Sequence, residues 1–523
     1  MYLLRPDLHT RRAFLQRSAQ LAATGVALPT ALNLAAMGEA AAQQATDYKA
    51  LVCVFLYGGN DYANTVVTYD DPSHALYTTA RGVAGTAGSI SISKADLAAT
   101  ALTPTTALAG GRQFALHPSM TGLANLFNTG KAAVQLNVGP LIKPVDKAGY
   151  LSANRQAFPL PPKLFSHNDQ QSIWQSSSGE GSTVGWGGNI GDLALSTNGG
   201  ASLFTCISIT GNAVFLSGDT AQSYQVGSGG PVRIYNVPTT GRLAYPYGFK
   251  DVGDAMGVLT TSTAMPNLLE KAYNSVTKRA VNSEVAISDA IISTGPLKDA
   301  NGNVIKDAAG SITYPGSFNG FVSLDDKGKA LNNSLNDQLR MVARLIEARD
   351  KLSVKRQVFM VSLGGFDLHD NLIANQPKLM QYVSDAMTAF YKSTDAMGVA
   401  DKVTAFTASD FGRTMANNGD GSDHGWGSHH LMVGGAVKGK AFYGYAPPVG
   451  NGDSKSTAEV DQWSVGQGRL LPTTSVDQYA ATMAKWFGVP DDQMSSILPN
   501  LGNFNGQTTP SAIVYPANLG FML

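Results

Sequence analysis

The chain has 523 residues, 43% of them hydrophobic, so it is long enough to bury a large core. Its 38 lysines and arginines equal its 38 aspartates and glutamates, and this balance excludes the basic surface typical of a nucleic-acid-binding protein. After the N-terminal leader no stretch approaches the ~20 uninterrupted apolar residues of a membrane-spanning helix, so we expect no stable membrane span.

The first 42 residues have the pattern of an export signal. Arg11-Arg12 resembles the twin-arginine signature, a weakly apolar segment follows from Ala19 to Met37, and Ala40–Ala42 offers a small-residue cleavage site. An ordinary amphipathic helix after a basic pair is the alternative. We predict a twin-arginine signal peptide at 1–42, the twin-arginine translocase as a partner during export, and a periplasmic or secreted mature domain at 43–523.

The first apolar run of the mature chain is Lys49–Leu56, which predicts a central strand. Gly58 and Gly59 follow it and let the backbone turn tightly. Asp61 then lies where a metal ligand at the edge of a sheet is expected. An Asn-Asp turn or a helix cap is the alternative for this aspartate. Residues 132–138 predict a second strand.

Ser166 lies at the expected start of a helix. Together with Asp169, three residues later, it resembles a capping box in which aspartate replaces the usual glutamate or glutamine. A serine at a helix N-terminus near a divalent metal is also where an activated hydroxyl nucleophile would lie. The two interpretations are compatible in geometry, so the position alone does not separate them.

The chain changes character between about residues 185 and 330. Short β-like pieces joined by Gly, Ser and Thr come first, at 204–209, 213–216 and 232–237. A helical pattern follows at 267–285, and a turn-rich stretch comes after it. We interpret this region as an insertion or cap packed over the ligand edge of the sheet.

Two further apolar runs, 357–363 and 403–408, lack polar alternation and therefore predict strands buried on both faces of a parallel sheet. Residues 333–352 have helical spacing and predict a helix beside the first of these strands. A helix over 378–397 connects the two strands into a right-handed parallel unit. Residues 475–487 predict a closing helix, with Thr474 or Ser475 as its cap.

Potential metal ligands follow both of these strands, and ligands in open α/β sheets gather beyond the carboxyl ends of the strands. Asp367 and His369, two residues apart, can point to the same side of an extended backbone. A Gly-rich loop after the second strand carries further candidates. Mixed Asp and His ligands without cysteine favour zinc, manganese or iron. For any single Asp-His pair, a hydrogen-bonded loop is the alternative. We predict one or two divalent ions, with zinc or manganese preferred, held among Asp61, Asp367, His369, Asp410, Asp423, His424, His429 and His430.

Arg413 is the candidate for binding an anionic substrate. A guanidinium can hold an anionic group through two parallel hydrogen bonds. Because Arg413 follows Asp410 by three residues, it can equally serve to neutralise that carboxylate.

Taken together, these motifs resemble the family catalogued as domain of unknown function 1501, and with the leader the resemblance covers nearly the whole chain. The motifs are Gly58-Gly59-Asn60-Asp61, Ser166-His167, Gly185-Trp186, Gly364-Gly365-Phe366-Asp367-Leu368-His369, Ser409-Asp410-Phe411-Gly412-Arg413 and Asp423-His424-Gly425.

That family is itself similar to the alkaline phosphatase-like superfamily. The resemblance implies an α/β three-layer sandwich with a mainly parallel central sheet and an inserted cap region. It also implies Ser166 as nucleophile and metal ligation by Asp61, Asp367, His369, Asp410, His424 and one of His429 and His430.

The chain departs from that superfamily in three places. Its Asp-x-His spacing is shorter than usual, Asp410-Phe411 replaces the common Asp-His, and the Cys/Ser-x-Pro-x-Arg motif of type I sulfatases is absent. We predict a secreted metal-dependent hydrolase of phosphate esters, in preference to sulfate esters, acting on a small-molecule or polymer-borne anionic ester. The rival hypothesis is a non-catalytic envelope protein that keeps the fold as a binding or assembly scaffold.

Overall fold

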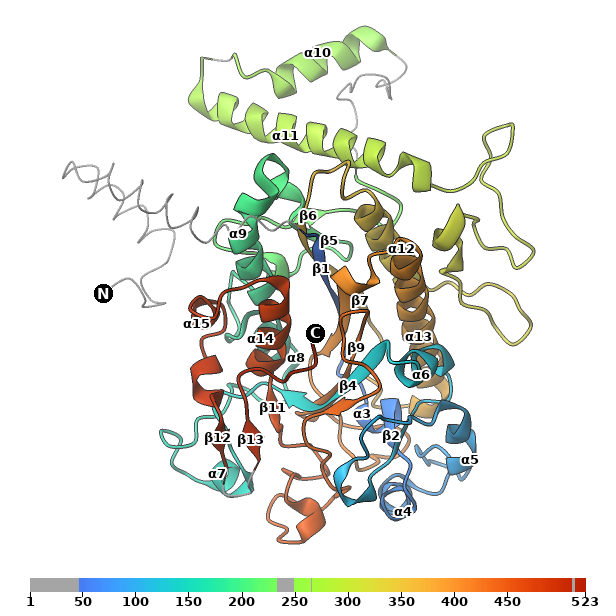
Figure 1. Cartoon of the computed structure of the whole chain (residues 1–523), viewed down its shortest axis with the longest axis vertical. Helices are drawn as coiled ribbons and strands as arrows, with labels where there is room; N and C mark the ends of the chain where they lie inside the picture. The colour runs from blue at the N-terminus through green and yellow to red at the C-terminus, as the bar shows by residue number, and fades with distance from the viewer. Residues whose placement is uncertain (1–46, 233–248, 265, 510–512) are drawn as a thin grey trace, which may run out of the picture.

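The computed structural model describes residues 47–232, 249–264, 266–509 and 513–523 (Figure 1). The predicted signal peptide and nearly all of the β-like piece at 232–237 lie outside these residues. Within the described ranges, no helix combines the length and the hydropathy that crossing a bilayer requires.

A mainly parallel sheet forms the centre of the molecule, as the buried apolar runs predict. Its strand order is β10-β4-β9-β8-β1-β7-β5-β6, and β11 also pairs with β4. Only β9, among the described strands of this sheet, runs antiparallel to its neighbours β4 and β8. The bounds are β1 Lys49–Leu56, β4 Ala132–Gly139, β5 Cys206–Ser208, β6 Tyr224–Gln225, β7 Arg356–Leu363, β8 Val403–Ser409, β9 Ser428–Gly434, β10 Phe442–Tyr443 and β11 Thr474–Ser475.

Helices cover both faces of the sheet because successive side chains of a strand point to opposite faces. In β1, Val52 and Val54 belong to one core cluster, whereas Cys53 and Phe55 belong to another. The first cluster includes side chains of α6 (Thr121–Asn128), α12 (Ser334–Glu347) and α13 (Leu372–Ala396). The second includes side chains of α8 (His167–Ser176), α9 (Trp186–Asn198) and α14 (Val476–Phe487). Figure 1 shows the two helical layers on either side of the strands.

Three neighbouring parallel strands bring distant parts of the chain to one edge. Leu56 at the end of β1 is in register with Leu363 of β7 and with Ser409 of β8. The loops that follow these strands therefore begin side by side. Because β9 is antiparallel to β8, it starts at the same edge, and the loop between them, residues 410–427, remains there.

The region predicted as an insertion contributes to the main sheet through β5 and β6, which follow β7 in the strand order. The β-like piece at 213–216 is instead a 3₁₀ helix, Val214–Leu216. Farther along, α10 (Lys250–Thr261) and α11 (Leu268–Ala290) form a helical pair at the top of Figure 1. The boundaries and capping role of this region stay a prediction.

His429 and His430 lie inside β9, so the prediction of a loop at these residues is wrong. His429 packs edge-on against Tyr62, and its Nδ1 accepts a hydrogen bond from the backbone N–H of Asn137 at 3.0 Å. His430 lies on the opposite face of the strand, against the ring of Trp174. Burial lowers the pKa of each imidazole to about 3, so both are neutral core side chains at neutral pH.

Asp61 is a helix cap and half of a buried ion pair. It accepts the backbone N–H of Ala63 at the start of α3 (Tyr62–Thr65). Its two carboxylate oxygens also accept from Arg81, at 2.6 Å from Nη1 and 2.8 Å from Nη2. Arg81 ends α4 (Asp71–Arg81) and donates to the carbonyl of Thr414, so this pair ties the loop after β1 to the loop after β8.

We expect Arg81→Met to lower the free energy of unfolding by about 3–5 kcal/mol, because it leaves the carboxylate of Asp61 buried without its partner. Urea unfolding measures the change. Arg112→Met is the matched control, since the side chains of Arg112 and Asp70 are less fully buried and lie 3.4 Å apart. A loss for Arg81→Met no larger than for the control would contradict the structural role assigned to this pair.

The buried imidazole of His430 should make stability pH-dependent. Between about pH 6.5 and pH 3 the unfolded chain protonates this side chain and the folded protein does not, so stability falls as the pH is lowered through this range. From pH 7.5 to pH 5 the loss attributable to His430 is about 2 kcal/mol. His430→Phe should remove that part of the loss when urea unfolding is compared at the two pH values. An identical loss in the variant and the parent protein would show that burial does not lower the pKa of His430 relative to the unfolded chain.

Candidate metal centre

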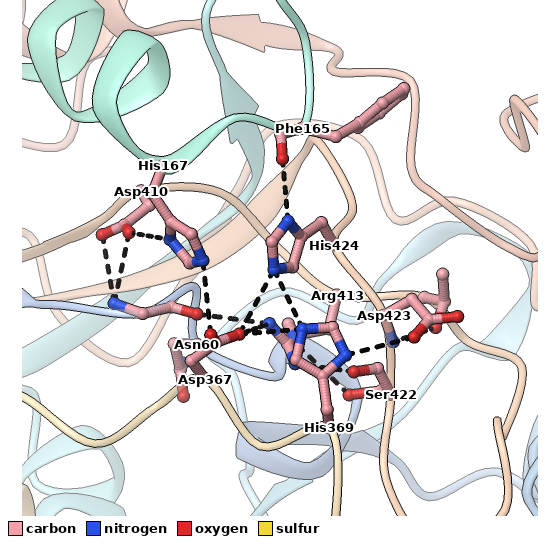
Figure 2. Close-up of polar contacts among 12 residues, drawn as sticks. Asn60, Phe165, His167, Asp367, His369, Asp410, Arg413, Ser422, Asp423 and His424 are labelled. Atoms are coloured by element: carbon pink, nitrogen blue, oxygen red, sulfur yellow. Dashed lines mark hydrogen bonds and ion pairs between the residues drawn. The ribbon is translucent and has the colours of Figure 1, made fainter.

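Three side chains from separate parts of the chain converge at the carboxyl edge of the sheet. Asp367 comes from the loop after β7, His424 from the loop between β8 and β9, and His167 is the first residue of α8. Each offers one ligand atom, and these atoms all lie within 4.8 Å of one another. Figure 2 shows them pointing toward a common centre, so this cluster is the candidate metal centre.

Asp367 is held by Arg413. The Nη1 of Arg413 donates to Oδ1 of Asp367 at 2.6 Å, and Nη2 donates to the carbonyl of Ser422 at 2.6 Å. Burial raises the pKa of Asp367, but the hydrogen bond and the positive charge of Arg413 outweigh it, and the pKa lies below its usual value. Arg413 is fully buried, and its guanidinium is hydrogen-bonded to protein groups. Its role in the structure is therefore to hold Asp367.

The backbone could not approach Asp367 so closely with any side chain at position 58. Gly58 has φ +116°, and a Cβ atom there would lie 2.4 Å from the backbone nitrogen of Asp367. The carbonyl of Gly58 also accepts from Arg413 at 3.3 Å. This glycine, two residues after the end of β1, thus lets the loops after β1, β7 and β8 meet.

His424 presents its Nε2 atom to the centre. Its Nδ1 lies 2.8 Å from the carbonyl oxygen of Phe165, and a carbonyl only accepts, so Nδ1 carries the proton. The lone pair of Nε2 then faces Oδ1 of Asp367 at 3.2 Å. Burial lowers the pKa of His424 and favours this neutral form.

His167 is oriented in the same way by Asp410. The Nδ1 of His167 lies 2.6 Å from Oδ2 of Asp410, a fully buried carboxylate that also accepts from Gln171 Nε2 at 2.8 Å. The hydrogen bond to Asp410 raises the pKa of His167 above its usual value, and partial burial opposes it. The Nε2 of His167 points at Oδ2 of Asp367, 3.4 Å away.

His369 adds a third imidazole. Its Nδ1 lies 3.2 Å from Oδ1 of Asp423, which also accepts from Asn418. Its Nε2 lies 3.0 Å from the Nε2 of His424 and 3.1 Å from Oδ1 of Asp367. Asp423 therefore orients His369 in the way that Asp410 orients His167.

This arrangement fits a divalent cation. Each imidazole has its Nδ1 bonded to an oxygen acceptor, as metal-ligating histidines usually do. The Nε2 atoms of His369 and His424 lie 3.0 Å apart, close enough for both to bind one cation. The donor set of imidazoles and a carboxylate without cysteine suits zinc, manganese or iron.

The structure brings only some of the predicted ligands to this centre. Asp367, His369 and His424 meet there, whereas Asp410 and Asp423 lie behind histidines and contact their Nδ1 atoms. The remaining three engage other partners, as described above: Asp61, His429 and His430.

Ser166 is the N-cap residue of α8, directly before His167. Its hydroxyl donates to Oδ2 of Asp169 at 2.9 Å, and its oxygen accepts no hydrogen bond from the helix backbone. Sequence reasoning assigned no ligand role to His167, although the Ser166-His167 motif was part of the family resemblance. The sequence signal that could have identified His167 is its position: a histidine at the expected start of a helix, next to other candidate site residues.

Comparison with known proteins matches part of the chain to a protein family. No curated protein matched the chain. A solved structure titled "Metabolism of multiple glycosaminoglycans by bacteroides thetaiotaomicron is orchestrated by a versatile core genetic locus (BT33494S-sulf)" aligns at 11% identity, over 85% of this chain and 74% of that chain, with a TM-score of 0.29. At that score the alignment carries no structural argument. Residues 269–498, which include Asp367, His369 and His424, match the model described as "Protein of unknown function (DUF1501)", and this match supports placing the chain in the DUF1501 family.

Proposed function

We propose that this protein is a metal-dependent hydrolase of anionic esters, phosphate in preference to sulfate. The observation that carries the proposal is the convergence of three imidazole Nε2 atoms on the carboxylate of Asp367. Each imidazole has an oxygen acceptor at its Nδ1. This favours the tautomer that carries its proton on Nδ1 and leaves Nε2 free to bind a metal. His167, Asp367 and His424 would hold a divalent cation, and His369 would complete or share the site.

A bound cation would polarise an ester oxygen and lower the pKa of a water or hydroxyl group. The chain's own residues prepare the ligands for it. Arg413 keeps Asp367 charged and in place, and Asp410 and Asp423 hold the histidine rings. Arg413 therefore acts as a positioning residue in this proposal, in place of the substrate clamp predicted from its position in the sequence.

Ser166 is the proposed nucleophile. Its hydroxyl donates to Asp169, whose carboxylate is buried and can accept the hydroxyl proton at Oδ2. Ser166 adjoins His167 in sequence, which places it next to a proposed ligand. Attack by water is the alternative that the Ser166 variants below distinguish.

The exposure of the centre bears on the class of substrate. The side chains of Asp367 and His369 are 45% and 41% exposed, so the ligands open to solvent and do not lie in a closed interior cavity. Such a centre can accept an ester carried on a polymer as well as a small molecule.

The export route and the fold superfamily are also part of the proposal. The Arg11-Arg12 motif supports twin-arginine export to the periplasm or beyond. The mainly parallel sheet, the helices on both faces and the ligands at its carboxyl edge support an alkaline phosphatase-like fold.

Asp367→Asn and His424→Ala should each lower the amount of Zn²⁺ that the protein retains after loading and desalting. They should also reduce the rise in melting temperature that Zn²⁺ produces, because a ligand that binds only the folded state stabilises it. His430→Phe is the control, since this side chain lies outside the centre, and the variant should retain Zn²⁺. Equal metal content in the parent protein and both centre variants would contradict the assignment.

The same preparations test the activity. A phosphate ester and a sulfate ester of p-nitrophenol, with and without chelator, report whether hydrolysis depends on metal and which anion is preferred. Zn²⁺ retention without hydrolysis of any ester in a broad screen would reject the hydrolase and favour a metal-binding scaffold of the envelope.

Ser166→Ala should lower kcat by several orders of magnitude if the hydroxyl is the nucleophile. Stability should fall by only about 1 kcal/mol, the usual net contribution of one hydrogen bond, here the one that Ser166 donates to Asp169. Ser166→Asp can accept from the helix backbone and should also be inactive. Turnover is measured on the best ester from the screen, beside melting temperature and Zn²⁺ content. Full turnover in both variants would show that water or another hydroxyl attacks and that Ser166 is not the nucleophile.

A further inference from the structure

We infer that Phe165 and Arg469 together are positioning residues that hold His424 as a metal ligand. The inference rests on the proposed metal centre and deepens it. Neither residue offers a ligand atom to the cluster, and neither was a candidate from the sequence. Both contact His424, from opposite ends of that residue: one holds its imidazole and the other its backbone.

Phe165 holds the imidazole through a strained backbone. Its φ of +72° lies in the left-handed region, which a bulky residue rarely adopts. In this conformation its carbonyl accepts the Nδ1 proton of His424 at 2.8 Å. Figure 2 shows this carbonyl directed at the ring of His424. The strain is therefore located where it selects the tautomer that points Nε2 at the centre.

Arg469 holds the backbone of the same histidine. Its Nε donates to the carbonyl oxygen of His424 at 2.7 Å, and its Nη1 donates to the carbonyl of Gly466 at 3.4 Å. The guanidinium also lies over the ring of Phe165, 5.3 Å from its centroid, at a distance suited to a cation–π contact. One side chain thus connects the backbone of the ligand to the residue that orients its ring.

These contacts leave His424 little freedom of rotation. Phe165 fixes the direction of the imidazole, Arg469 fixes the peptide from which it extends, and the stacking of Arg469 on Phe165 couples the two. Groups that orient a metal ligand usually change metal affinity by 10–100-fold when they are removed. The rival role for Arg469 is direct contact with an anionic substrate, which would leave metal affinity unchanged.

The test is the dissociation constant for Zn²⁺, measured on the full chain by competition with a chromophoric chelator. We expect Arg469→Met and Phe165→Gly each to weaken Zn²⁺ binding by about 10–100-fold. The absorption spectrum of the Co²⁺-loaded protein should change in both variants, because it reports ligand geometry. Phe165→Gly can keep φ near +72° without strain, so the variant should fold. It removes the ring that Arg469 contacts and lets the carbonyl turn away from Nδ1 of His424, which is the cause of the expected loss of affinity.

Two matched controls separate positioning from general effects. Lys163→Gly also relieves a positive φ, +42°, in the same loop but leaves the hydrogen bond to His424 in place. Lys143→Met removes a cation over the ring of Phe158, a similar contact away from the centre. Both controls should bind Zn²⁺ as the parent protein does.

The His424→Ala background decides the mechanism. If Arg469 acts through His424, adding Arg469→Met to His424→Ala should weaken Zn²⁺ binding no further. An additional loss equal to that seen in the parent background, or unchanged affinity in both single variants, would overturn the inference. A raised KM for an ester with unchanged Zn²⁺ affinity would assign Arg469 to the substrate instead. Zn²⁺ affinity is measured without an ester. The effect of the variants on Zn²⁺ binding can therefore be interpreted even if the protein hydrolyses no ester.

Discussion

A buried guanidinium that holds one carboxylate is the interaction on which the candidate centre depends. Arg413 comes from the loop after β8, Asp367 from the loop after β7, and the glycine beside them, Gly58, from the loop after β1. Because these strands are neighbours in parallel register, three loops begin side by side, and the Arg413–Asp367 pair joins two of them. Without a charge partner of this kind, a carboxylate facing three imidazoles would have no fixed direction.

The chain contains two ion pairs between a buried arginine and an aspartate, and they differ in how far the carboxylate is exposed. Asp61 and Arg81 form an ion pair in which both side chains are removed from water, and both carboxylate oxygens are taken by the arginine. In the second pair the arginine is equally buried, but the carboxylate of Asp367 is 45% exposed and only its Oδ1 accepts from Arg413. The first pair can only stabilise the fold. The second leaves an oxygen available, and this difference in burial makes one aspartate structural and the other a ligand candidate.

The histidines show the same division. His429 and His430 alternate across a buried strand, where neutral imidazoles pack as aromatic core residues. His167, His369 and His424 lie in loops or at a helix start and have oxygen acceptors at Nδ1. An imidazole becomes a ligand here because a second group holds its far nitrogen. Phe165, Asp410 and Asp423 supply those groups, and only one of the three was not suspected from the sequence.

The sequence by itself determined the parallel strands, because unalternating apolar runs such as Lys49–Leu56 require burial on both faces. It also determined that polar residues after β7 and β8 share an edge, because that follows from parallel pairing. Only the tertiary structure decided which of those residues meet. The direction of a carboxylate depends on partners distant in sequence: Arg413 lies 46 residues from Asp367, and His167 lies 243 residues from Asp410. Local spacing carries no information on such long-range contacts. The sequence alone therefore does not distinguish a metal ligand from a residue that orients a ligand.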